Sequence, residues 1–130
     1  TGILLRTRPD WLRRDGIVID VKTTIDPRPH KWIGQAAGLG YHASAALCID
    51  ILREVTGEEH EVHFLVVGKE PPHLSYIATL DATAIETGRQ IYHAALMTWA
   101  ACEKAGEWPG YGAVVNLSLP AWALPKPEEP

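Results

Sequence analysis

Two aspartates and a lysine lie close together near the start of the chain, in the stretch RPDWLRRDGIVIDVKTT, residues 8–24. Asp10 follows a proline, while Asp20 and Lys22 stand on a run of β-branched residues. Paired carboxylate oxygens select hard cations such as Mg²⁺ or Mn²⁺, whereas zinc normally recruits His or Cys. This stretch is therefore the first candidate for chemistry.

The two aspartates are expected to face each other across a β-hairpin. Residues 3–12 and 17–24 read as strands whose apolar residues, Trp11 among them, fall on odd positions, so we expect the odd positions in the core. The even positions of both strands then share the other face, which requires a loop with an odd number of residues. Residues 14–16, ending in a glycine suited to the left-handed conformation, satisfy this requirement and place Asp10 opposite Asp20.

Facing carboxylates would destabilise a hairpin that had only a structural role. Facing residues hold their Cβ atoms roughly 4.5–5.5 Å apart, and two carboxylates about 5 Å apart repel by roughly 3 kcal/mol at an effective dielectric near 20. Three arrangements relieve the repulsion: a shared proton, the ammonium of Lys22 on the same face, or a divalent cation between the carboxylates.

The remaining elements predict one mixed α/β domain over residues 1–124, followed by a loose Pro- and Glu-rich tail at 125–130. In chain order after the hairpin, we expect a loop rich in Pro and Gly, a helix from about Tyr41 to Val55, strands at 62–67 and 74–80, and a helix from about Ala84 to Lys104. The TAIE stretch at 83–86 resembles a capping box, and Gly106 marks the end of the last helix.

Charge and composition restrict the partners. The net charge is −4, but residues 1–31 carry seven basic and four acidic side chains, so this end could face a polyanion or form an ordinary solvated surface. No apolar run approaches eighteen residues and no signal-peptide pattern is present, so we expect a soluble protein without a membrane partner. Cys48 and Cys102 are expected to be free, buried thiols in a reducing compartment.

Arg8-Pro9-Asp10 followed by the segment 19–24, IDVKTT, resembles the core signature of the PD-(D/E)xK nuclease superfamily. More narrowly, the motifs RPDWL, GIVIDVKTT, GYHASAALCIDIL, HFLVVGKEPP, GEWPGY and LSLPAWA are similar to the nuclease domain of RecE-type exonuclease VIII and its phage relatives. The resemblance implies an α+β, restriction-endonuclease-like fold with a mixed central sheet flanked by helices. Its first helix would precede Thr1, so we expect an N-terminal truncation or a degenerate copy.

The resemblance also implies a role for each residue of the signature. Asp10 and Asp20 would be ligands of Mg²⁺ or Mn²⁺, and the carbonyl of Val21 would be a further ligand. Lys22 would position or activate the attacking water and neutralise charge that develops on the phosphate. Residues that would contact DNA or support the ligands are Arg6, Arg8, Thr24, Tyr41, His42 and Ser44. Ser44 stands where relatives generally place a glutamine.

Three function classes follow. By resemblance, the first is a metal-dependent exonuclease that digests double-stranded DNA ends in phage-type recombination, in the cytoplasm of a bacterial or phage-infected cell. Relatives form ring-shaped homo-oligomers, so a ring and a recombination partner protein belong to this hypothesis. The second class is an inactive DNA-binding or assembly module of the same fold, and the third is a hydrolase of another phosphate ester.

Overall fold

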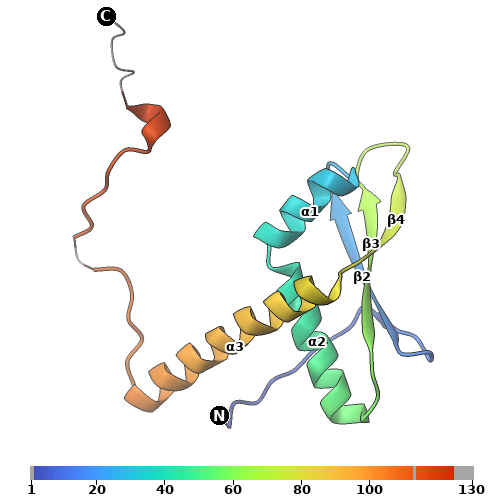
Figure 1. Ribbon diagram of the computed structural model, residues 1–130, viewed down its shortest axis with the longest axis horizontal. Helices are drawn as coiled ribbons and strands as arrows, with labels where there is room; N and C mark the ends of the chain where they lie inside the picture. The colour runs from blue at the N-terminus through green and yellow to red at the C-terminus, as the bar shows by residue number, and fades with distance from the viewer. Residues whose placement is uncertain (1, 113, 125–130) are drawn as a thin grey trace, which may run out of the picture.

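The computed structural model describes residues 2–112 and 114–124, which form a four-stranded sheet with helices on one side (Figure 1). The elements are, in chain order, β1 (Trp11–Leu12), β2 (Ile17–Thr24), α1 (Pro29–Gly38), α2 (Tyr41–Thr56), β3 (Glu61–Gly68), β4 (Ser75–Thr79), α3 (Ala82–Ala105) and the 3-10 helix η1 (Ala121–Ala123). The expected tail at 125–130 lies outside the described residues.

The strands are ordered β1-β2-β3-β4 in a mixed sheet. β1 is antiparallel to β2, β2 is parallel to β3, and β3 is antiparallel to β4. The connection between the two parallel strands passes through α1 and α2, because parallel neighbours need a long crossover. The predicted fold class, α+β with a mixed central sheet and flanking helices, is confirmed.

The helices cover the face of the sheet that carries even-numbered residues, so the predicted burial of the odd positions is wrong. Val18, Phe64 and Val66 are buried beneath the helices. Trp11, expected in the core, is 64% exposed and Val21 is 46% exposed. A period of two identifies the residues that share a face, but both faces of these strands are rich in Ile, Val and Leu. The pattern therefore did not indicate which face the helices cover.

The first predicted strand, residues 3–12, is also largely wrong, because only Trp11 and Leu12 pair with β2. Before them the chain leaves the sheet and runs along α2, where Ile3 and Leu5 line a cavity together with Leu47. Pro9 has no backbone N–H to donate to a strand ladder, which is consistent with pairing that stops just beyond it.

The segment expected to be a Pro- and Gly-rich loop contains α1. Pro29 occupies the start of this helix, where the missing N–H costs nothing and the fixed φ is favourable. Trp32 of α1 is buried against Phe64 of β3, with ring centroids 5.6 Å apart. A high content of proline and glycine favours a loop, but here Pro29 begins the helix and Gly38 ends it.

The other elements agree with the sequence-based expectation within a few residues. The start of α3 differs in detail, since Asp81 rather than Thr83 caps it, with Asp81 Oδ1 accepting from the N–H of Ala84 at 2.7 Å. Gly106 ends α3 in the left-handed conformation, as expected. No helix in the described part of the chain combines the length and hydrophobicity of a membrane span.

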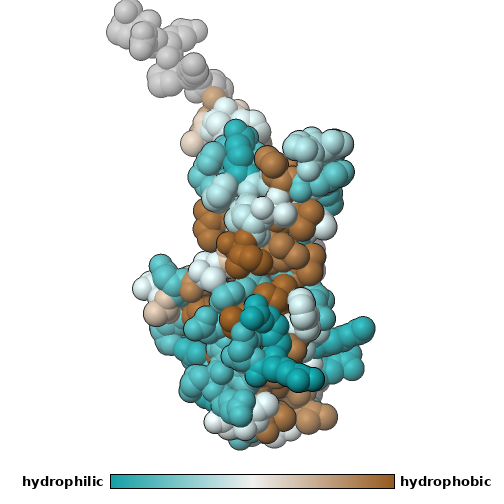
Figure 2. Space-filling model, turned by 90° about the vertical axis from the view of Figure 1, so that its right-hand side faces the viewer, coloured by the Kyte–Doolittle hydropathy of each residue, from teal (hydrophilic) through white to brown (hydrophobic). Residues whose placement is uncertain are grey.

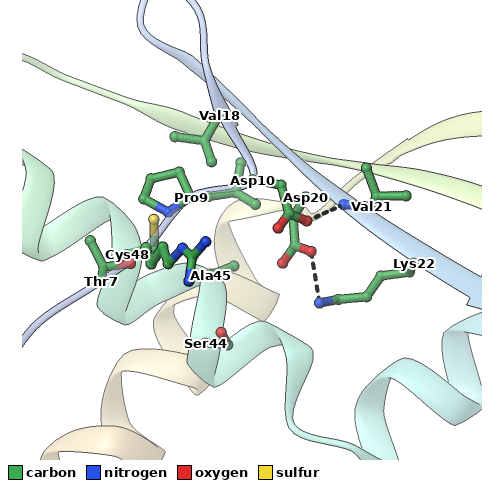
Figure 3. Close-up of a pocket in the computed structure, with 12 residues that line it drawn as sticks. Thr7, Pro9, Asp10, Val18, Asp20, Val21, Lys22, Ser44, Ala45 and Cys48 are labelled. Carbon is green, nitrogen blue, oxygen red and sulfur yellow. Dashed lines mark hydrogen bonds and ion pairs between the residues drawn. The ribbon is translucent and has the colours of Figure 1, made fainter.

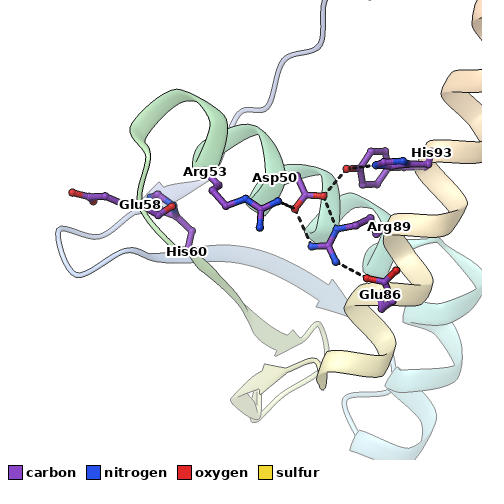
Figure 4. Close-up of polar contacts among 8 residues, drawn as sticks. Asp50, Arg53, Glu58, His60, Glu86, Arg89 and His93 are labelled. Atoms are coloured by element: carbon purple, nitrogen blue, oxygen red, sulfur yellow. Dashed lines mark hydrogen bonds and ion pairs between the residues drawn. The ribbon is translucent and has the colours of Figure 1, made fainter. Parts of the chain in front are cut away.

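An ionic cluster joins α3 to α2 (Figure 4). Arg89 of α3 donates two hydrogen bonds to the Asp50 carboxylate, at 2.7 and 2.9 Å, and the Tyr92 hydroxyl donates a third at 2.5 Å. The hydrogen bonds from Arg89 lower the pKa of Asp50. Burial, together with the neighbouring Asp50 carboxylate, raises the pKa of Tyr92 to about 12.

The two helices also approach closely at a glycine. A Cβ atom added to Gly88 of α3 would lie 2.2 Å from the carbonyl oxygen of His42 in α2, far inside van der Waals contact. This contact and the cluster around Asp50 fix α3 across α2, and α2 in turn packs against β3 of the sheet.

The opposite face of the sheet is not covered by any helix in residues 2–112 and 114–124 (Figure 1). Trp11, Val21 and Ile77 are exposed on it, with Leu65 and Val67 half-buried between them. Apolar side chains gather on the side of the molecule seen in Figure 2. We refer to the uncovered face of the sheet as the outer sheet face; it consists of residues 11, 19, 21, 65, 67 and 77.

Candidate active site

The loop of the β1–β2 hairpin has the predicted length. The backbone N–H of Arg13 donates to the carbonyl of Ile17 at 2.9 Å, so three residues, 14–16, form the loop. Gly16 has a φ of 84°, in the left-handed region, and a Cβ there would lie 3.1 Å from the carbonyl oxygen of Glu59. Both the positive φ and the close approach favour glycine at this position.

The hairpin register places the two aspartates opposite each other. Trp11 pairs with Ile19, and the same register continued by one residue sets Asp10 against Asp20. Hydrogen-bonded and non-hydrogen-bonded pairs alternate along an antiparallel ladder, and the Arg13 hydrogen bond makes the Asp10 and Asp20 position a non-hydrogen-bonded one. Side chains approach most closely at such positions. The two carboxyl groups lie near each other, Asp10 from the bend before β1 and Asp20 from β2 (Figure 3).

Asp10 is held in place by the backbone of β2. Its Oδ2 accepts a hydrogen bond from the N–H of Val21 at 2.9 Å. In a strand, the N–H and C=O of one residue point toward the same edge, so the Val21 carbonyl also faces the β1 side. The ladder partner of Val21 in this register would be Pro9, which has no N–H to donate to that carbonyl. The proline thus leaves the Val21 carbonyl available to another group beside Asp10.

Lys22 projects from β2 on the same face as Asp20. Its Nζ lies 2.7 Å from Asp20 Oδ1, and both side chains are about one quarter exposed. On its other side, Nζ lies 4.7 Å from the ring centroid of Tyr41, the first residue of α2. Lys22 therefore partly neutralises the carboxylate pair, leaving one formal negative charge on the three side chains.

These groups line one cavity of about 370 Å³ between the hairpin and α2 (Figure 3). From the hairpin side, Arg8, Asp10, Asp20, Val21 and Lys22 reach it, and Ser44, Ala45 and Cys48 form the wall from α2. Most of the predicted site residues therefore come together. The cavity is open to solvent, since the carboxyl and ammonium groups keep part of their exposure.

Four predicted residues do not line the cavity; Tyr41 contacts Lys22 beside it, and the other three lie elsewhere. Arg6 is exposed and does not line the cavity. Thr24 is buried farther along β2, where its hydroxyl donates to Gln35 Oε1 of α1 at 2.9 Å. His42 lines a separate, largely apolar cavity of about 320 Å³ with Ile33 and Leu80.

Cys48, which the sequence predicts only as a buried thiol, is a neighbour of the site. It is buried, unpaired and part of the cavity wall. Burial is the main cause of the raised pKa of the Cys48 thiol. A hydrogen bond with Thr7 lowers this pKa, and the charge of Asp20 raises it. Its position one helical turn after Ser44 is the signal that would have identified it.

The donor set fits a hard cation. Two carboxylates and a free backbone carbonyl converge on the cavity, all of them oxygen donors. Mg²⁺ is usually bound by one or two carboxylates and retains several water molecules. Within residues 2–112 and 114–124, no group of three or more His, Cys, Asp or Glu side chains is arranged to hold a metal, so a cation here would have two carboxylates as its side-chain ligands.

A mixed sheet backed by helices, with an aspartate pair and a lysine on its β1–β2 hairpin, is the architecture of a PD-(D/E)xK nuclease-like domain. A family model described as "PDDEXK-like domain of unknown function (DUF3799)" matches residues 1–117. The chain belongs to this family, and the expected superfamily is thereby confirmed.

One solved structure with the same fold is a "Putative exonuclease" from Eubacterium rectale. The sequence identity is 22% and the TM-score is 0.57, over 72% of this chain. The matched part makes up 38% of the length of that protein. A search of curated proteins gave no match.

Proposed function

We propose that the protein is a metal-dependent deoxyribonuclease that hydrolyses phosphodiester bonds at double-stranded DNA ends, as the resemblance to RecE-type exonuclease VIII implies. The observation that carries this proposal is the meeting of Asp10, Asp20 and Lys22 in one solvent-open cavity of a nuclease-like domain. The "Putative exonuclease" with the same fold supports it further.

The residues of the cavity have complementary tasks in this proposal. Asp10, Asp20 and the Val21 carbonyl hold the cation, and Lys22 orients the attacking water and compensates negative charge on the phosphate in the transition state. Mg²⁺ or Mn²⁺, when bound, lowers the pKa of a water molecule and polarises the phosphoryl oxygens. Arg8, at the edge of the cavity, contacts a neighbouring phosphate.

The polymer substrate is supported by the charge distribution. Residues 1–31 carry a surplus of three positive charges in a chain whose net charge is −4. Arg13 and Arg28 pair with Asp15 and Asp26, respectively. The remaining positive surplus lies in the segment that carries the acidic site, which suits a polyanion that must approach the carboxylates. A ring-shaped homo-oligomer, a recombination partner protein and a cytoplasmic location complete the proposal and depend on the family resemblance alone.

A second candidate function, a non-catalytic DNA-binding or assembly module, is favoured by one observation. Ser44, with its short side chain, lines the cavity where relatives generally carry a glutamine. A site that lacks this glutamine would still bind a phosphate backbone while hydrolysing it slowly or not at all.

Cleavage of end-labelled linear duplex by the intact gene product tests the proposal. We expect release of nucleotides from linear duplex with Mg²⁺ or Mn²⁺, none with EDTA, none from closed circular duplex, and none with Asp20→Ala. Binding of duplex without release of nucleotides would favour the second candidate. Faster hydrolysis of small phosphate esters than of duplex would overturn both and favour a different phosphoesterase.

A further inference from the structure

Lys22 has two neighbours of opposite kinds. On one side, Nζ forms an ion pair with Asp20 Oδ1 at 2.7 Å. On the other side, Nζ lies 4.7 Å from the ring centroid of Tyr41, within the range of a cation–π contact. The ammonium is therefore held between a carboxylate on its own strand and an aromatic face on α2.

The Tyr41 ring is fixed by the core. It is stacked on Phe64, with centroids 6.0 Å apart and an interplanar angle of 26°, and it is tilted against Trp32 at 6.2 Å. Phe64 is fully buried, and it is the partner of Asp20 in the β2–β3 register. The three rings thus form a rigid support directly behind the candidate site.

The two neighbours of Lys22 respond differently to a bound cation. A cation held by Asp20 competes with the ammonium for the carboxylate oxygens, which weakens the ion pair. The aromatic face is neutral and is not a cation ligand in this site, so its contact with Lys22 is unaffected by that competition. A lysine on a flexible four-carbon stem would otherwise be free to leave the cavity.

We propose that Tyr41 is a positioning residue whose ring face keeps the Lys22 ammonium at the cavity while Asp20 is engaged by a cation. This inference rests on the proposed function for its catalytic meaning, but the contact itself can be tested without cleavage. The ring acts through Lys22 and has no chemical step of its own.

The contact is measured first by NMR on the intact gene product with ¹³C-labelled lysine. The ε-methylene signal that disappears in Lys22→Met identifies Lys22. We expect this signal to be shifted upfield by the ring current in the wild type, to remain so with Mg²⁺, and to remain so in Tyr41→Phe. In Tyr41→Leu it should move to the position of the exposed lysines, while Tyr111→Leu, at a fully exposed tyrosine, leaves it in place. Loss of the upfield shift on adding Mg²⁺ would overturn the proposal.

The catalytic consequence is measured with phenylalanines of increasing fluorine content at position 41. Fluorination removes the negative potential of the ring face and preserves most of the packing, so this series remains informative if Tyr41→Leu does not fold. From phenylalanine to the most fluorinated ring, turnover on duplex should fall stepwise by about tenfold in total, with KM nearly constant. Turnover that is independent of fluorination would contradict the positioning role. If the wild type does not cleave DNA at all, the proposed function fails, and the NMR measurement still decides the contact.

Discussion

Asp10 and Val21 are joined by a hydrogen bond from the backbone N–H of Val21 to the Asp10 carboxylate, at 2.9 Å. Because β1 begins only at Trp11, the backbone before it does not pair with β2. The Asp10 side chain instead accepts the hydrogen bond that the Val21 N–H would otherwise donate to a strand neighbour. The same bond fixes the carboxylate next to Asp20 before any cation arrives. Strand β2 and the bend just before β1 thus position the acidic pair.

The first prediction concerns the carboxylate of Asp20. Asp20→Asn removes one negative ligand and should lower the affinity for Mn²⁺ by an order of magnitude or more, since carboxylate count sets the affinity of such sites. Isothermal titration measures this affinity. Asp15→Asn is the matched control, because Asp15 lies in the hairpin loop and pairs with Arg13. Equal Mn²⁺ affinity in Asp20→Asn and the wild type would exclude Asp20 as a ligand.

The second prediction concerns Pro9. In Pro9→Ala, the new backbone N–H allows the β1–β2 pairing to extend beyond Trp11, and it can then occupy the Val21 carbonyl. A neutral hydrogen bond contributes about 1 kcal/mol, so we expect Mn²⁺ binding to weaken by roughly fivefold. Pro109→Ala, in the exposed C-terminal segment, should bind like the wild type. If NMR shows the new N–H at position 9 bonded to the Val21 carbonyl and binding is nevertheless unchanged, the Val21 carbonyl is not a ligand.

The third prediction separates binding from chemistry at Lys22. Lys22→Met preserves the length of the side chain and removes its charge, which frees Asp20 from its ion pair. Mn²⁺ affinity should therefore stay the same or rise, while turnover on linear duplex falls by about 10²–10³, as for the loss of one transition-state donor. Parallel titration and cleavage assays measure both. A variant with full turnover would remove Lys22 from the mechanism.

The fourth prediction concerns the crossing of α2 and α3. Gly88→Ala places a methyl group 2.2 Å from the His42 carbonyl oxygen, so the helices must move apart and the free energy of unfolding should drop by about 1–3 kcal/mol. Gly34→Ala, in the interior of α1 with open space around it, should raise the stability by about 0.5–1 kcal/mol. Urea unfolding measures whether the free energy of unfolding falls in Gly88→Ala and rises in Gly34→Ala.

The fifth prediction concerns Tyr92 at alkaline pH. Its pKa is raised to about 12 by burial and by the adjacent Asp50 carboxylate, whereas a tyrosine in the unfolded chain ionises near 10. Between these values the unfolded state releases the proton first, so the stability from this group is complete below pH 10 and declines as the pH rises toward 12. Tyr92→Phe should show a smaller decline in unfolding free energy over this window than the wild type.

The control for this pH dependence is Tyr111→Phe. Tyr111 is fully exposed, so its removal should leave the slope of stability against pH unchanged. A Tyr92→Phe variant with the slope of the wild type would show that the ionic cluster of α2 and α3 does not oppose ionisation of Tyr92.

The hairpin shows how much of the site could be predicted from sequence. The loop length and the position of Asp10 opposite Asp20 follow from local facts. Gly16 can adopt a positive φ, and even-numbered residues of both segments must lie on the same face of the hairpin. The exposure of Trp11 and the burial of Val18 depend instead on which face the helices cover. That choice is made by tertiary packing, which the alternation of residues in a strand does not encode.

Among the helices, too, some features follow from the local sequence and others depend on tertiary packing. Tyr41–Thr56 and Ala82–Ala105 have long apolar periodicity and glycines at their ends, and both could be predicted closely. The helix Pro29–Gly38 was not predicted because Pro29 and Gly38 stand at its ends, where they are compatible with helix, and Gly34 weakens the helical pattern in its interior. Its burial depends on Trp32 meeting Phe64, a contact between residues 32 positions apart that no local pattern reveals.

The outer sheet face and the cavity of Asp10 and Asp20 lie on opposite sides of β2. A protein surface resting on Val21 and Ile77 would thus leave the entrance between the hairpin and α2 unobstructed. In the proposed exonuclease, assembly through the outer sheet face and cleavage of DNA in the cavity would therefore be sterically independent.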